Sequence, residues 1–153
     1  MGTILSFRRV TPEELDRALI DSAALSEIIW RERPNGEPSG YLDKAWGGLY
    51  FLFEAAAVPV NLAYDGSPIG DEGTYFAWPA ATVERVARVL RSTPFERLAA
   101  YYDRAVFTER GVYPNIWYEG SGALDYLRHH YTSLTRFFDT AARTGSAAIM
   151  HFG

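Results

Sequence analysis

The sequence contains no cysteine, which excludes three classes of site before any motif is considered. A chain without thiols has no disulfide framework, no thiolate zinc site and no cysteine nucleophile. Proteins without disulfides are typical of the cytoplasm, and we expect this protein to act there. Lysine is nearly absent as well, since Lys44 is the only lysine among 15 basic residues.

Two further features are missing: an excess of positive charge and a long apolar run. The 15 basic residues face 19 acidic ones, and the net charge of −4 argues against nucleic acid as a partner, because phosphate binding needs a basic surface. No stretch approaches the roughly 20 apolar residues of a membrane-spanning helix, so we expect no membrane partner. The sequence also lacks a phosphate-binding loop and a dinucleotide-binding glycine pattern, and we expect no cofactor.

What remains is the composition of a globular protein of 153 residues, 48% of them hydrophobic and 22% charged. A chain of this size buries about two thirds of its unfolded surface, which is enough for one core without covalent staples. We therefore expect a single domain over residues 1–153. The acidic balance is compatible with docking a basic partner protein.

The periodicity of the chain predicts an α+β fold. Apolar runs predict strands at both ends, over 3–8 and 146–152, and another over 74–78. Apolar residues at three- and four-residue spacing predict helices from Pro12 onward and over 22–31, 43–53, 80–92, 95–102, 103–109 and 121–143. Because strands stand at both termini with helices between them, we expect a mixed β-sheet that includes the N- and C-terminal strands, with several helices packed on it.

The stretch 54–64 is ambiguous between strand and loop. Val58, Val60 and Leu62 alternate with other residues, as they do on a half-buried strand. Pro59 cannot donate a hydrogen bond to a neighbouring strand, so such a strand belongs at a sheet edge. We predict a strand over 58–64, with loops rich in proline and glycine over 33–40 and 65–73.

Several motifs occur together in the order of one known family. They are RRVTPEEL at 8–15, LDKAW at 42–46 with Leu49 and Leu52 after it, SPIGDE at 67–72, YP-x-IW at 113–117 and LDYL at 124–127. Over nearly the whole chain they resemble the YfbM-like family of small bacterial proteins. The resemblance implies an α+β domain. It implies no reaction, substrate or catalytic residue, because that family has no established activity.

The densest motif contains Asp43, Lys44 and Trp46, at the predicted start of a helix. Asp43 and Lys44 can form a carboxylate–amine pair in a cleft, where burial would tune either group for proton transfer. Alternatively, Asp43 caps the helix by accepting backbone amide hydrogens, a contact worth about 1 kcal/mol, while Trp46 packs into the core. The cap is the simpler interpretation.

Asp71 and Glu72 form a second candidate, two adjacent carboxylates in a loop flanked by glycine. Such a pair can hold a divalent cation or act as a general base. However, the spacing is not that of a calcium-binding EF-hand, and no further oxygen ligand is fixed, so we expect no metal. Aspartate next to glycine is also ordinary turn chemistry.

The aromatic loop 113–117 is the third candidate, and aromatic residues make up 15% of the chain. Tyr113 and Trp117 offer large, rigid contact area with a polar tip, as binding surfaces favour. Pro114 holds the preceding backbone extended and so favours presentation of Tyr113. Trp117 can equally be a plug in the core beneath the last helix.

The sequence as a whole favours a non-enzymatic binding module. We expect the helix over 43–53, the loop at 68–73 and the loop at 113–117 to meet around an aromatic and acidic cleft. That cleft would dock an unknown protein partner, such as the basic toxin of an immunity-type antidote, or a small ligand.

Two other functions stay open. One is an enzyme that uses Asp43, Asp71 and Glu72 as acid, base or metal ligands, with Lys44 or Tyr113 as an electrophilic partner. This alternative requires those side chains to converge in one pocket. The other is a homo-oligomer subunit with an exposed aromatic patch. The binding-module hypothesis requires the three segments to meet around one cleft in the structure.

Overall fold

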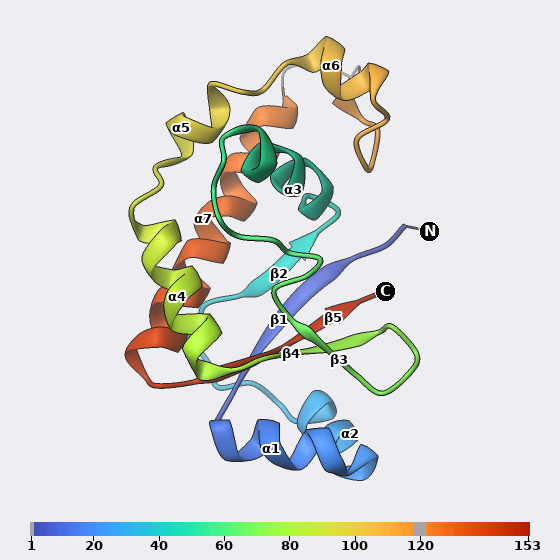
Figure 1. The fold of residues 1–153 in the computed structure, drawn as a ribbon, viewed down its shortest axis with the longest axis vertical. Coiled ribbons are helices and arrows are strands. Elements are labelled where there is room, and N and C mark those ends of the chain that lie inside the picture. The colour runs from blue at the N-terminus through green and yellow to red at the C-terminus, as the bar shows by residue number, and fades with distance from the viewer. Residues whose placement is uncertain (1, 118–121) are drawn as a thin grey trace.

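The computed structural model describes residues 2–117 and 122–153 and shows a five-stranded sheet with helices on both faces (Figure 1). The strands are β1 (Leu5–Val10), β2 (Gly40–Asp43), β3 (Ser67–Ile69), β4 (Tyr75–Trp78) and β5 (Ala147–Phe152). Their order is β2-β1-β5-β4-β3, so the two terminal strands lie inside the sheet and β2 and β3 form its edges. The prediction of an α+β fold with both terminal strands in the sheet is confirmed.

The sheet is antiparallel throughout rather than mixed. Each of the four pairings among the described strands, β1 with β2, β1 with β5, β3 with β4 and β4 with β5, is antiparallel. A parallel pair needs a crossover that carries the chain back to the same end of the sheet. Here the helical segments return the chain in the opposite direction, so the expected parallel pairs do not form.

The helices divide between the two faces of the sheet (Figure 1). They are α1 (Pro12–Ile20), α2 (Ser22–Trp30), α3 (Trp46–Ala55), α4 (Ala80–Arg91), α5 (Phe95–Ala99), α6 (Arg104–Glu109) and α7 (Gly122–Arg143). One face carries α3, α4 and α7 over the main core, whereas α1 and α2 pack on the other face over a smaller cluster. In the described part of the chain, no helix is both long and apolar enough to cross a membrane.

Strand alternation explains why one short sheet supports two cores. In β1, Phe7 points into the main core and contacts Trp78 and Phe138, with ring centroids 5.0 and 5.1 Å away. Val10, at the other parity, points to the cluster under α1 and α2, where it joins Ile149 of β5. Successive side chains of a strand face opposite ways, so each strand serves both sides.

Two predicted helices have local features that fix where they begin and pack. At the start of α1 the Thr11 hydroxyl accepts from the Glu14 amide at 3.1 Å, and the Glu14 carboxylate accepts from the Thr11 amide at 2.9 Å. This capping box satisfies two backbone donors that the helix itself cannot satisfy. In α7 the apolar stripe is buried as predicted, with Leu127, Leu134 and Phe138 fully inaccessible. The predicted helix start at 121 lies outside the described residues.

The predicted strand over 58–64 is wrong, because these residues form an irregular segment. Its apolar side chains are nevertheless buried in the main core, so the alternation marks burial and not a strand. The backbone is hydrogen-bonded locally: Val58 N donates to Phe53 O at 2.8 Å, and Asn61 N donates to the Asp65 carboxylate at 2.8 Å. Backbone groups satisfied within the loop are not available to a neighbouring strand.

Two short strands occupy places where the sequence predicts loop or helix. β2 begins at Gly40, and the helix expected from residue 43 starts only at Trp46. β3 lies inside the predicted loop 65–73 and carries Pro68. Proline is tolerated in an edge strand because no further strand needs its missing amide hydrogen. Both elements are too short to show a periodic pattern in the sequence.

Close packing explains the two consecutive glycines near the start of α3. A Cβ at Gly48 would lie 2.7 Å from the Leu127 side chain and 2.9 Å from that of Trp117. A Cβ at Gly47 would clash with the carbonyl oxygen of Tyr113 and lie 2.9 Å from its Cβ. Without these side chains, α3 approaches both α7 and the 113–117 segment closely.

We therefore expect Gly47→Ala to destabilise the protein by about 1–3 kcal/mol, the range for overpacking a close contact. The direction of this change in stability is informative, because alanine at an unhindered position inside a helix stabilises it by about 1 kcal/mol relative to glycine. Gly122→Ala in α7 is the matched control, since no atom of the described residues lies within 4 Å of the place its Cβ would take, and the stability of this variant should equal or exceed that of the wild type. Urea unfolding measures both, and a stabilised Gly47 variant would contradict the packing described here.

Candidate functional site

The structure places the predicted site residues in two separate regions. Asp43 is the last residue of β2, whereas Asp71 follows β3, and these strands are the opposite edges of the sheet. Four strand spacings of about 4.8 Å put the two edges about 19 Å apart. The helix, the 68–73 loop and the 113–117 loop therefore do not enclose one common cleft, and that prediction is wrong.

Lys44, Trp46 and Tyr113 do come together. The Trp46 indole stacks on the Tyr113 ring with centroids 5.0 Å apart and donates from Nε1 to the Thr3 carbonyl at 3.0 Å. The Tyr113 hydroxyl is buried and the Lys44 side chain is half-buried, and both lie against Gly2. Tyr113 thus packs inward and is not presented to a partner, contrary to the expectation drawn from the proline after it.

Trp117 is a core residue. Its side chain is 0% exposed, and its indole Nε1 donates to the Val112 carbonyl at 2.7 Å. Phe107 meets it edge-on, with ring centroids 4.9 Å apart. A side chain with no accessible surface cannot touch a partner, so of the two interpretations of Trp117 the core plug is the correct one.

Asp43 does not cap α3. Among the residues that the structure describes, no side chain caps that helix, and Asp43 instead has a positive φ of 50° at the end of β2. Its carboxylate accepts from the Tyr126 hydroxyl at 2.6 Å and from the Tyr41 hydroxyl at 3.2 Å. These contacts join β2 to α7, and they hold a backbone conformation that aspartate adopts more readily than most residues.

The hydrogen bonds around Asp43 set its charge state. The Tyr126 hydroxyl, which also accepts from the Lys44 amide at 3.2 Å, holds the pKa of Asp43 below its usual range. Burial and the neighbouring carboxylate raise the pKa of Tyr126. Burial lowers the pKa of His130, whose ring contacts that of Tyr126. An aspartate with a lowered pKa is a weak base, so this cluster suits a structural tie better than proton transfer.

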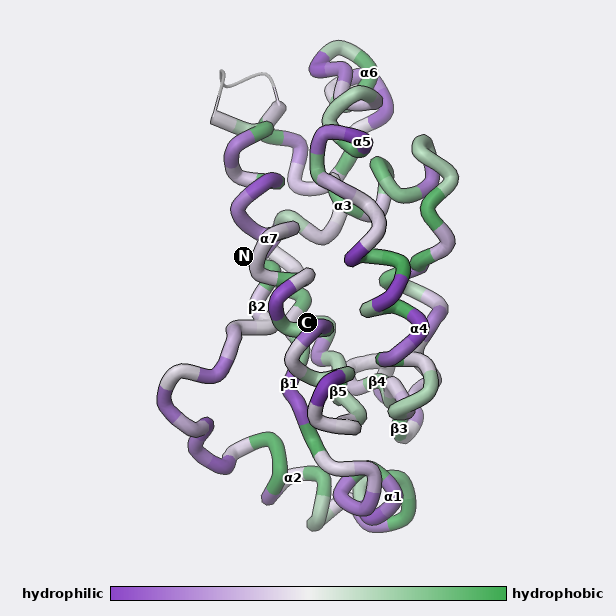
Figure 2. Tube along the Cα trace, turned by 90° about the vertical axis from the view of Figure 1, so that its left-hand side faces the viewer, coloured by the Kyte–Doolittle hydropathy of each residue, from purple (hydrophilic) through white to green (hydrophobic). Residues whose placement is uncertain are grey.

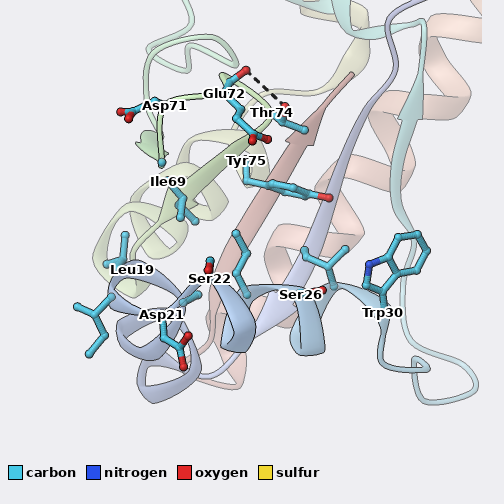
Figure 3. Close-up of a pocket in the computed structure, with 15 residues that line it drawn as sticks. Leu19, Asp21, Ser22, Ser26, Trp30, Ile69, Asp71, Glu72, Thr74 and Tyr75 are labelled. Carbon is cyan, nitrogen blue, oxygen red and sulfur yellow. Dashed lines mark hydrogen bonds between the residues drawn. The ribbon is translucent and has the colours of Figure 1, made fainter.

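A groove lies on the other side of the sheet, between α2 and the β3–β4 hairpin (Figure 3). Its volume is about 540 Å³, in the range of ligand-binding clefts. We call it the α2–β4 groove. It is lined by residues 18–22, Leu25, Ser26, Ile29, Trp30, 69–72, Thr74 and Tyr75. Asp71 and Glu72 are therefore the two predicted site residues that line this groove.

The groove combines exposed apolar side chains with carboxylates. Trp30 is 82% exposed, Ile20 88% and Leu19 49%, although all three are large apolar residues. In Figure 3 the Glu72 carboxylate points toward the ring of Tyr75, whereas Asp71 points away from it. The loop that carries both is held by a hydrogen bond from the Thr74 hydroxyl to the Glu72 carbonyl at 3.5 Å.

The sequence contains a signal for this groove that apolar periodicity alone does not reveal. Leu25, Ile28 and Ile29 form the inward face of α2, and Trp30 falls outside that face at the end of the helix. A tryptophan off the buried stripe is an informative position, because it leaves a large apolar surface in water. Tyr75, the first residue of β4, is half-exposed, whereas Ala77 and Trp78 further along the strand are buried.

The described residues contain no group of three or more histidine, aspartate or glutamate side chains that could hold a metal ion. Asp71 and Glu72 are both exposed, and they line the groove with Asp21, whose carboxylate caps α2 by accepting from the Ala23 amide at 3.0 Å. The carboxylates at the groove are thus placed to meet a charged group of a ligand at its rim.

We expect Asp43→Asn to lower the free energy of unfolding by about 1 kcal/mol at pH 7, since asparagine keeps the shape and tolerates the positive φ but loses the charge-assisted hydrogen bonds. The folded-state pKa of Asp43 lies below its unfolded value. Its stabilisation is therefore complete above about pH 4 and is lost as the pH falls through the folded-state pKa.

Urea unfolding from pH 7 down to pH 3 measures this effect. The difference between wild type and Asp43→Asn should shrink below about pH 4. Tyr126→Phe is the partner variant, and its cost should add incompletely to that of Asp43→Asn because the two groups share one hydrogen bond. A difference that stays the same at pH 3 would contradict a role for the ionised carboxylate.

Comparison with known proteins agrees with this fold. YfbM from Escherichia coli, a protein of unknown function with a crystal structure, superposes with a TM-score of 0.71 at 16% identity, covering 98% of this chain and 99% of that chain. At this identity the similarity shows the fold alone. No curated protein matches the chain. The family described as Domain of unknown function (DUF1877) matches residues 1–151, and the chain therefore belongs to that family.

Proposed function

We propose that this protein is a binding module that docks a segment of a partner protein in the α2–β4 groove. The observation that supports it is the gathering of Trp30, Ile20 and Leu19, all exposed, around one hollow of about 540 Å³. Large apolar side chains left in water around a single hollow are typical of interaction surfaces. Trp30 and Tyr75, which line the same hollow, are also of the residue types that dominate binding energy at interfaces.

The lining favours a partner segment that is apolar and basic. Asp21, Asp71 and Glu72 bring negative charge to the groove, and no arginine or histidine of the described residues lines this hollow. Trp30 and Tyr75 add ring faces, which attract ammonium and guanidinium groups. A leucine-like side chain would fill the apolar floor while a lysine or arginine beside it meets Glu72. A basic toxin held by an antidote is one partner of this chemistry.

The enzymatic alternative loses its geometric basis. It requires Asp43, Asp71 and Tyr113 to converge in one pocket, but Asp43 is tied to Tyr126 at one edge of the sheet and Asp71 lies beyond the other. No residue of 113–117 lines the groove that holds Asp71 and Glu72. We also propose a cytoplasmic location, because a chain without cysteine cannot form the disulfide bonds that stabilise proteins in an oxidising compartment.

Capped decapeptides test the proposal. Each carries two leucines separated by one residue, flanked by lysines, glutamates or serines, and backbone amide NMR shifts of the ¹⁵N-labelled protein follow binding. We expect the lysine peptide to bind most tightly and the glutamate peptide most weakly, with shifts concentrated in α2 and β4. Should none of the three peptides move these resonances at millimolar concentration, the proposal fails.

Trp30→Ala should lower the affinity for the lysine peptide about tenfold or more, which is the scale of the loss when an aromatic anchor is removed from an interface. Because Trp30 is 82% exposed, the variant should keep the unfolding midpoint of the wild type. Tyr64→Ala is the matched control: it removes another aromatic side chain, 80% exposed, that does not line the groove. Equal losses of affinity in both variants would exclude a specific role for Trp30.

A further inference from the structure

The α2–β4 groove continues into a second hollow of the opposite charge. This hollow, of about 360 Å³, is lined by Ser6, Arg8, Ile29, Trp30, Arg33, Tyr75, Ile149 and His151. Ile29, Trp30 and Tyr75 line both hollows, so the two form one continuous surface. Arg8 and Arg33 give this hollow positive charge, and none of the described residues that line it is acidic. We call this end of the groove the basic end.

The basic end is built on the part of the sheet that α1 and α2 leave uncovered. Tyr75, His151 and Ser6 are register neighbours across β4, β5 and β1, so their side chains form one row on the same face. The rings of Tyr75 and His151 lie 5.1 Å apart. Arg8 stands two residues beyond Ser6 on β1 and donates one hydrogen bond to the Arg31 carbonyl at 3.0 Å.

Arginines from two segments crowd this end. Arg8 comes from β1 and Arg33 from the connection after α2, which stands away from the body of the protein in Figure 2. Burial, with the charges of Arg33 and Arg31 nearby, lowers the pKa of Arg8, while Glu37 opposes that shift. An arginine remains charged throughout the physiological range. Glu14, Glu32 and Glu37 line a neighbouring hollow together with Arg8 and Arg33, whereas the basic end has no described acidic residue in its lining. An anionic group in the basic end would therefore meet two guanidinium groups.

From this charge separation we infer that the groove takes a dipolar occupant: a peptide segment with a basic residue over Glu72 and Tyr75 and an acidic group over Arg8 and Arg33. The inference rests on the proposed function and assigns chemistry to its partner. Two strand spacings and two residues along β1 separate Tyr75 from Arg8, which is about 12 Å. An extended chain rises about 3.3 Å per residue, so the two charges should lie about four residues apart.

The basic end of the groove distinguishes a dipolar segment from a uniformly basic one. A lysine placed against Arg8 and Arg33 would meet like charge, which costs binding energy and suppresses wrong partners. The Trp30 side chain lines both hollows and suits the aliphatic residues between the two charges of the segment. The peptide side chains would therefore read basic, apolar, then acidic along the groove.

Three capped peptides test this arrangement. Each carries a lysine, two leucines and, four residues after the lysine, a glutamate, a serine or a second lysine. For the wild type we expect the glutamate peptide to bind about two- to fivefold tighter than the serine peptide, the range for an exposed ion pair, and the second lysine to weaken binding. Arg33→Glu should invert this order, so that the peptide with two lysines binds best.

Arg88→Glu on the exposed side of α4 is the matched control, since it changes the net charge equally but lies outside both hollows. This variant should bind the three peptides in the same order of affinity as the wild type. If all three peptides bind equally and Arg33→Glu changes nothing, the dipolar occupant is wrong while the docking groove stands.

If no peptide changes the backbone amide NMR shifts of α2 or β4, the proposed function itself fails. Sedimentation equilibrium supplies the remaining test. Self-association that Trp30→Ala abolishes would overturn the inference, because a second copy of the chain would then fill the groove. A monomer at the concentrations of the titration is the expected result.

Discussion

The antiparallel pairing of β1 with β5 is the contact on which the rest of this structure depends. Six residue pairs join the two terminal strands, from Leu5 with Phe152 to Val10 with Ala147. This pairing brings the two ends of the chain together in the middle of the sheet and gives every neighbouring strand a template. It also gives the sheet two faces that are covered by different helices, because the helices that follow β1 and those that precede β5 pack on opposite sides.

The unequal covering of the two faces explains where a partner can bind. The face under α3, α4 and α7 is closed by aromatic packing, and it includes Trp78 and Trp117, neither of which has accessible surface. In the described part of the chain, two short helices cover the other face, so Tyr75 and His151 remain partly exposed beside α2. The polar cluster of Asp43 and Tyr126 lies at an edge and stabilises the junction of β2 with α7.

Several individual residues show how far sequence reasoning reaches in this fold. The stripe of α7 and the capping box at Thr11 were predictable, because both depend on spacing within one helix. Asp43 was misassigned, since its partners Tyr41 and Tyr126 come from β2 and α7 and only the fold brings the latter near. The sequence predicted a cleft containing Asp71 and Glu72, but the walls of the groove come from α1 and α2.

By itself the sequence determined the α+β class, the places of most helices and the strands at both termini, because these follow from periodicity, capping and apolar runs. The tertiary structure alone decided which polar and aromatic residues meet. Sheet order separates Asp43, at the end of β2, from Asp71, after β3, and the fold brings Trp30 and Tyr75 from distant segments to one hollow. Local propensity acts over a few residues, whereas a binding surface depends on which strand lies next to which and on which face the helices leave open.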